Sequence, residues 1–213
     1  MLPFGKIRIE SGFLLLSKRD NTGLWELITS LHYGFAQNFE CSLDLPYITR
    51  YSPEGNYDGL ADGDVKIKYN FYNNDKEAAS FMLGYLPGDP AIDSTSTHSN
   101  ISTMLIYAND IDQFSYNLNF EYTFDADISR ATKNDYIIYN ASATRPLTDA
   151  MKLTGEIQYS RNTNTLVIVG ETAIGISYRY DDNLTYDAAL GCGLNENSSS
   201  SSFICGLTYL VSL

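Results

Sequence analysis

A strict alternation of apolar and polar side chains in FSYNLNFEYTF, residues 114–124, most constrains what this chain can fold into. Its aromatic and leucine side chains fall on one side, and its serine, asparagine, glutamate and threonine side chains fall on the other. A period of two predicts a β-strand with two chemically opposed faces. In a soluble β-protein the aromatic face would be the core, whereas in an outer-membrane barrel it would meet lipid.

The same alternation recurs along the chain, and no segment sustains the spacing of a helix. It predicts strands at residues 6–17, 24–36, 38–47, 64–72, 80–86, 101–108, 114–124, 135–144, 151–160, 166–180, 184–194 and 203–213. Most of these segments are longer than the roughly five or six residues usual in globular sheets. They match the roughly 9–11 residues with which a tilted strand crosses a bilayer.

The predicted connections alternate between short and long. The short ones are residues 37–38, 73–77, 109–113, 145–150 and 181–183. Most of the others are longer and rich in Gly, Asn, Asp and Ser, namely 50–63, 87–100, 125–134 and 195–202, whereas 19–23 and 161–165 are shorter. Bacterial outer-membrane barrels have short periplasmic turns and long outer loops. We therefore expect one domain over residues 1–213, an all-β, 12-stranded antiparallel transmembrane barrel with both termini in the periplasm. A two-sheet sandwich is the alternative, but it would have shorter strands and irregular loops.

Composition narrows the class of protein further. The formal net charge of −12 gives no basic patch for phosphates, so we expect no nucleic-acid partner. Mean hydropathy is −0.21, which fits a soluble protein and a barrel equally well. No apolar run approaches the roughly 20 residues of a membrane helix. The first residues lack the features of a secretory signal, so the chain is either cytosolic or a mature form. The barrel pattern favours a mature form in a bacterial outer membrane.

The polar face of the predicted strands should point into the barrel. Twelve strands enclose a lumen too wide to be filled by a dry aromatic interior. A lysine or arginine on the lipid face would cost roughly 2–4 kcal/mol at mid-bilayer, so the charged strand residues should also point inward. The inward candidates are Arg8, Glu10, Glu26, His32, Glu40, Asp44, Asp64, Lys66, Lys68, Glu121, Lys152, Glu156, Glu171, Arg179 and Asp187.

The inward charges admit two interpretations. They form either a charged pore that selects solutes by field and size, or a lumen closed by ion pairs. In the closed form, Lys66 and Lys68 would pair with Glu40 and Asp44 of the preceding strand. The sequence leaves both interpretations open.

Other residue clusters carry weaker signals. His32 and His98 have no GxSxG motif beside them, so we expect no enzymatic activity. Asp58, Asp62 and Asp64 lack the order of a calcium loop and are typical turn formers. We expect neither a metal nor a cofactor, and the absence of a CxxC pair argues against zinc.

The sequence leaves open whether two of the three cysteines form a disulfide. If the last two strands pair symmetrically about residues 195–202, Cys192 lies opposite Cys205. Opposed residues in an antiparallel pair are close enough for a disulfide, which an oxidising compartment permits. The two residues form either this disulfide or a pair of lipid-facing thiols, and Cys41 has no partner in either case.

Two stretches resemble known outer-membrane barrels. Residues 43–71, LDLPYITRYSPEGNYDGLADGDVKIKYNF, followed by LGYLPGDP at 83–90, are similar to the family named for the meta-pathway of phenol degradation. The likeness lies in the motifs LPY, DGDV, KYNF and LPGD. Two positions depart from the family: it has arginine in place of Asn70, and it has a threonine between the proline and the glycine of LPGD. Gly206, Tyr209 and Val211 also resemble a barrel assembly signal, although Ile204 stands at a usually polar position and the chain runs on to Leu213.

The resemblance implies a barrel that transports aromatic or apolar compounds. We therefore expect passive passage or binding of small solutes, with outer-membrane lipid and a small-molecule solute as partners. The alternative is a non-transporting barrel that anchors or supports a complex, with its long outer loops contacting a protein partner. An open lumen favours the first function, and a lumen blocked by ion pairs favours the second.

Overall fold

The computed structural model describes residues 1–17, 22–51, 56–61, 63–87, 99–126 and 135–212. Within these residues the chain forms strands and no helices. The strands are β1 (Lys6–Ser17), β2 (Gly23–Ala36), β3 (Phe39–Tyr51), β4 (Tyr57–Leu60), β5 (Asp64–Asn73), β6 (Glu77–Leu86), β7 (Asn100–Ile111), β8 (Phe114–Asp125), β9 (Tyr136–Pro146), β10 (Met151–Asn162), β11 (Ile168–Arg179), β12 (Leu184–Gly193) and β13 (Ser201–Ser212). In the described part of the chain no helix is long and apolar enough to cross a membrane.

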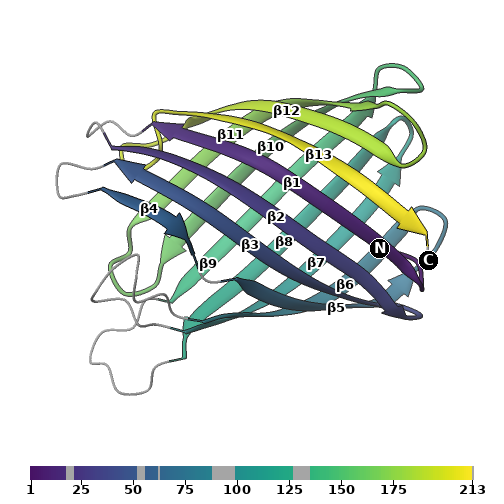
Figure 1. The fold of residues 1–213 in the computed structure, drawn as a ribbon, viewed down its shortest axis with the longest axis horizontal. Helices are drawn as coiled ribbons and strands as arrows, with labels where there is room; N and C mark the ends of the chain where they lie inside the picture. The colour runs from purple at the N-terminus through teal and green to yellow at the C-terminus, as the bar shows by residue number, and fades with distance from the viewer. Residues whose placement is uncertain (18–21, 52–55, 62, 88–98, 127–134, 213) are drawn as a thin grey trace.

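The strands close into one antiparallel barrel, which confirms the predicted fold class. β1 pairs with β13 along its whole length and with β2 on its other side, while β2 also pairs with β3. β3 pairs with β5, and from β5 to β13 each neighbour follows chain order. Without β4, the wall of the barrel therefore has twelve strands, and they run obliquely around it (Figure 1). Closure pairs each of the twelve described wall strands on both sides, whereas β4 pairs on one side.

β4 is the one described strand that the sequence pattern did not predict. It lies inside the expected loop at residues 50–63 and pairs only with the end of β3, from Tyr47 opposite Leu60 to Arg50 opposite Tyr57. β3 was predicted to end at residue 47 but continues to Tyr51. This extension pairs with β2 on one side and with the short strand β4 on the other.

Short turns gather at one end of the barrel, as predicted. Residues 37–38 and 112–113 each connect two strands directly, and Asn38 (φ 67°) and Asp112 (φ 54°) adopt the left-handed conformation that such tight turns require. Figure 1 places both chain ends at this same end of the barrel. We call it the short-turn end and the opposite one the loop end.

Burial is inverted relative to a soluble protein. Large apolar side chains such as Leu190 (63% exposed) and Leu118 (53%) cover the outside, while Glu40 (4%) and Asn70 (6%) are buried inside. Among the described residues Leu2 is the one buried hydrophobic side chain. A soluble protein places its apolar side chains in a core and its charged ones in water. The aromatic face of residues 114–124 therefore belongs to an apolar exterior that suits lipid.

The candidate lumen site

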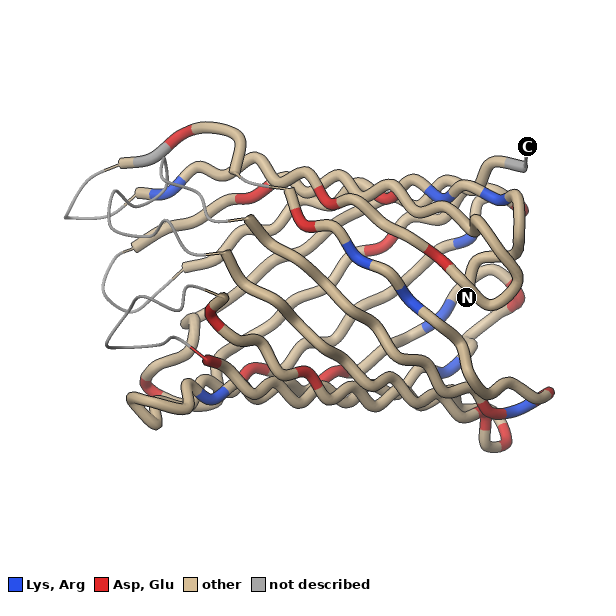
Figure 2. The backbone as a smooth tube through the Cα atoms, turned by 90° about the horizontal axis from the view of Figure 1, so that it is seen from below, with Lys and Arg blue, Asp and Glu red and all other residues tan. Residues whose placement is uncertain are grey.

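All fifteen residues predicted to point inward lie on one face of the sheet. Residues directly opposite each other in a ladder share a face, and the registers link Arg8 to His32, Asp187 to Gly206 and Glu156 to Ser142 around the ring. This face also carries the buried polar side chains Glu40 and Asn70. Figure 2 shows charged positions distributed along the strands of the wall. That these residues line a solute path remains a prediction.

One side of the lumen holds a dense set of ion pairs, which we call the Arg8–Glu40 cluster (Arg8, Glu10, His32 and Glu40). Arg8 Nε lies 2.8 Å from Glu10 Oε1, and an Arg8 guanidinium nitrogen lies 3.4 Å from Glu40 Oε1. His32 Nδ1 is 3.0 Å from Glu40 Oε1, and its Nε2 is 3.5 Å from Glu10 Oε2. Strands β1, β2 and β3 each supply members, so the cluster ties three neighbouring strands together.

The first residues of the described chain fold into the lumen against this cluster. The backbone N–H of Leu2 donates a hydrogen bond of 2.9 Å to Glu40 Oε2. Gly34 faces inward on β2, and a Cβ there would clash with the carbonyl oxygen of Pro3. Glycine at position 34 is therefore needed for the close approach of this segment. The sequence did not predict that residues 1–5 enter the lumen, because they carry no alternating pattern.

A second cluster lies on β3 and β5. Lys66 Nζ is 2.6 Å from Asp44 Oδ2 and 2.8 Å from Asp64 Oδ2. The closed-lumen interpretation paired Lys66 and Lys68 with Glu40 and Asp44, and only the Lys66–Asp44 pair forms. Glu40 is engaged by Arg8 and His32 instead, and Lys68 has no ion pair within the described residues.

Glu121 faces inward on β8. Strands β10, β11 and β12 carry three further inward carboxylates that we call the acidic wall: Glu156, Glu171 and Asp187. None of them forms an ion pair with a lysine or arginine in the part of the chain that the structure describes. Glu156 accepts a hydrogen bond of 2.6 Å from the side-chain amide of Asn140. The acidic wall therefore keeps its negative charge uncompensated, in contrast to the ion-paired side.

Three adjoining hollows run along this part of the lumen. One of about 180 Å³ is lined by Glu156 and Asp187, a second of about 180 Å³ by Glu156 and Glu171, and a third of about 210 Å³ by Asp187 and Glu10. Glu156 and Asp187 each border two hollows, so the three spaces adjoin. A Cβ at Gly206 would lie 2.9 Å from Asp187 Oδ2, so glycine leaves room for this carboxylate.

Aliphatic side chains also face the hollows, which the charge-based reasoning missed. Leu14, Leu16 and Ile204 line the second hollow together with Glu156 and Glu171. The run Phe13–Leu16 is apolar at both parities, and this break in the alternation was the signal that could have indicated an apolar patch inside the barrel.

The symmetric register that would place Cys192 opposite Cys205, one of the two alternatives left open by the sequence, does not form. In the structure Cys205 lies opposite Ala188, and all three cysteines are free. The connection after β12 is not symmetric, because Leu194 N–H and Ser198 Oγ both donate to the carbonyl oxygen of Gly170 on β11, at 2.7 and 2.6 Å. This attachment shifts the register of β12 against β13 away from the symmetric one.

The remaining predicted residues lie near the loop end or outside the described chain. Asp58 on β4 accepts hydrogen bonds from Thr49 Oγ1 at 2.6 Å and from the Tyr47 hydroxyl at 2.9 Å, and these two donors lower the pKa of its carboxyl group. Asp62 and His98 fall outside the described residues, so the calcium and hydrolase interpretations that used them remain untested.

Comparison with solved structures places the chain among known barrels. It superimposes on the COG4313 outer membrane channel from Pseudomonas putida F1 with a TM-score of 0.74 and 10% identity, over 99% of this chain and 96% of that one. It superimposes on the KdgM and NanC porins, each with a TM-score of 0.70 and 12% identity, over 95% of this chain and 98% of theirs.

Sequence comparison adds no closer relative. No protein-family model and no curated protein matches the chain, so the resemblance to the phenol meta-pathway family is not confirmed. Together with the closed antiparallel ladder and the apolar exterior, the structural likenesses show that this chain has the fold of outer-membrane porins and channels.

Proposed function

We propose that this protein is a passive pore of a bacterial outer membrane that favours small cationic and neutral solutes, with its short-turn end in the periplasm. The observation that carries this proposal is the acidic wall along the three adjoining hollows. On β1 and β5, the cations Arg8 and Lys66 are already paired with carboxylates. A solute that passes along the hollows therefore meets unpaired negative charge.

Uncompensated carboxylates in a narrow, partly desolvated lumen attract cations and repel anions. The field of a charge is stronger beside a low-dielectric wall than in bulk water, and rings or rows of acidic side chains make channels cation-selective. Glu156 and Asp187 occupy the positions with most influence, because each borders two hollows.

The similar solved porins support passage of small solutes, but the solutes of those porins do not transfer directly to this chain. The KdgM porin has been solved in complex with disordered oligogalacturonate, an acidic sugar chain. In the present lumen such a solute would meet Glu156, Glu171 and Asp187, so we expect acidic oligosaccharides to be disfavoured. Inward-facing Leu14, Leu16 and Ile204 support solutes that carry an apolar or aromatic group, as the phenol meta-pathway resemblance implies.

The test is the ion selectivity of the refolded protein in a planar bilayer. Under a KCl gradient we expect a reversal potential that indicates K⁺ over Cl⁻, which shifts toward zero in the double variant Glu156→Gln, Asp187→Asn. Asp75→Asn in the turn between β5 and β6 removes one exposed carboxylate and is the matched control. Anion selectivity, or no conductance from protein shown to be inserted, would overturn the proposal.

Residues 1–5, which enter the lumen, favour a second function. Leu2 and Pro3 lie against the Arg8–Glu40 cluster and narrow the barrel near the short-turn end. If this contact blocks passage, the barrel serves as a structural or anchoring partner in an outer-membrane complex. In that case the wild type is silent in a bilayer, whereas Glu40→Gln, which weakens the hold on Leu2, conducts.

A further inference from the structure

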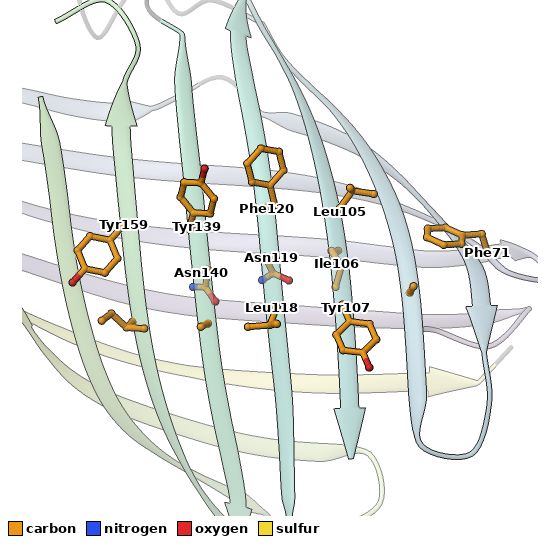
Figure 3. A pocket seen from close by; sticks show the side chains of 13 residues that line it. Phe71, Leu105, Ile106, Tyr107, Leu118, Asn119, Phe120, Tyr139, Asn140 and Tyr159 are labelled. Atoms are coloured by element: carbon orange, nitrogen blue, oxygen red, sulfur yellow. The ribbon is translucent and has the colours of Figure 1, made fainter. Parts of the chain in front are cut away.

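A further hollow lies on the outside of the barrel. It is an apolar groove of about 520 Å³ over β5–β10, seen in Figure 3. Ala79, Tyr107, Leu118, Ala141 and Ile157 lie directly opposite one another across five successive strands and share the outward face. The groove therefore belongs to the lipid-facing surface and is separate from the hollows of the lumen.

Small side chains create the depth of the groove. Ala79 and Ala141 form low points in a surface that is otherwise built from leucine and aromatic side chains. Phe120 and Tyr139 stand beside them as a wall, with ring centroids 5.2 Å apart, and Tyr159 extends the wall on β10 (Figure 3). The shape of the groove fits a linear apolar chain, which a flat outer surface would not hold in place.

One end of the groove carries a carboxylate. Tyr107, which lines the groove, donates its hydroxyl to Glu77 Oε1 at 2.8 Å, and Tyr72 donates to Glu77 Oε2 at 3.3 Å. Asn74 and Asn109 make longer contacts of 3.4 Å. Glu77 is the first residue of β6, next to the short turn, and forms no ion pair with a lysine or arginine of the described residues.

We propose that the groove binds a phospholipid with a primary ammonium headgroup, one acyl chain lying in the groove and the ammonium at Glu77. Within a bilayer, acyl chains gain no hydrophobic free energy by leaving other lipids, so preference must come from packing and from the headgroup. Glu77 supplies the charge complementarity, since the hydrogen-bond donors that orient its carboxylate are neutral and it has no ion pair within the described residues. The short-turn position puts Glu77 where headgroups lie.

This inference rests on the membrane location in the proposed function and not on solute passage. A barrel that binds the lipid but does not conduct leaves the inference intact. A barrel that conducts with cation selectivity but shows no lipid preference overturns the lipid site and leaves the pore standing. The two proposals therefore fail independently.

The experiment is native mass spectrometry of the folded, delipidated barrel with equal amounts of dioleoyl phosphatidylethanolamine and dioleoyl phosphatidylglycerol. The acyl chains are identical, so any preference reports the headgroup. We expect the ethanolamine adduct to exceed the glycerol adduct by about two- to fivefold, the range of an exposed ion pair, and Glu77→Gln to bring the ratio close to one. Circular dichroism and gel mobility before and after heating establish that each variant is folded.

Two further variants test the groove itself. Ala141→Phe fills the groove and should reduce adducts of both lipids, whereas Ala188→Phe adds the same ring to the outward face of β12, away from the groove, and should leave them unchanged. An unaltered ethanolamine preference in Glu77→Gln, or equal adducts in Ala141→Phe and Ala188→Phe, would overturn the proposal. So would a dimer that Ala141→Phe dissociates, because the groove would then bind a second copy.

Discussion

Lys66 Nζ lies 2.6 Å from Asp44 Oδ2, joining β5 to β3 across the lumen face of the wall. The side chains are 25% and 19% exposed, so water screens this pair only in part. Asp64 contacts the same ammonium group at 2.8 Å. One lysine therefore contacts two carboxylates, near the point where β3 leaves β5 and continues with β4.

Replacing Lys66 should destabilise the barrel. Lys66→Met leaves Asp44 and Asp64 facing each other without a countercharge, and we expect the free energy of unfolding to fall by about 1–3 kcal/mol. Urea unfolding of the protein in lipid vesicles measures this change. Lys68→Met is the control, because Lys68 also faces inward on β5 but forms no ion pair within the described residues. Equal losses in the two variants would contradict the ion-pair assignment.

The carboxyl group of Asp58 should titrate at unusually low pH. Hydrogen bonds from Thr49 and Tyr47 favour its charged form and lower its pKa. Its contribution to the attachment of β4 is therefore present above the ordinary carboxyl pKa of about 3.9 and is lost as pH falls through the lowered value. A ¹³C NMR titration measures the midpoint. Thr49→Val should raise this midpoint toward the ordinary value, and an unchanged midpoint would exclude the hydrogen bond as the cause.

Trp25 is the single tryptophan of the chain, so its fluorescence can measure how deep this part of the outer surface lies in the membrane. Its ring centroid lies 6.0 Å from that of Phe13 and 5.8 Å from that of Tyr47, in an outward aromatic row near the loop end. Aromatic side chains of barrels gather at the membrane interfaces. We expect lipids brominated close to the headgroup to quench Trp25 fluorescence more strongly than lipids brominated at the end of the acyl chain. The absence of quenching by both would contradict a lipid-facing exterior.

Disulfide formation between engineered and native cysteines can test the register between β12 and β13. Cys205 lies opposite Ala188, and directly opposite residues have Cα atoms about 4.5–5.5 Å apart, within the range of a disulfide. Oxidation of an Ala188→Cys variant should therefore bridge positions 188 and 205. The wild type should yield no Cys192–Cys205 bridge under the same conditions. Peptide mass spectrometry without reduction identifies the linkage, and a bridge in the wild type would restore the symmetric register.

The sequence by itself determined the existence of the twelve strands of the wall, the lengths of most connections and the side of the wall on which the charged strand residues lie. Period-two alternation requires only that a strand be extended, and the high cost of charge in lipid decides which face points outward. The inward positions of Glu156 and Asp187 follow from these two facts.

Only the tertiary structure decided which inward residues meet. A register slip of two or four residues keeps every side chain on its face but changes every partner, so the alternation carries no information about the slip. Closure of the barrel fixes the stagger of all strands together. For this reason Glu40 binds Arg8 and His32 instead of Lys68, and Cys205 meets Ala188 instead of Cys192. The lumen hollows and the outer groove depend on the same stagger, because each is formed by side chains from several strands.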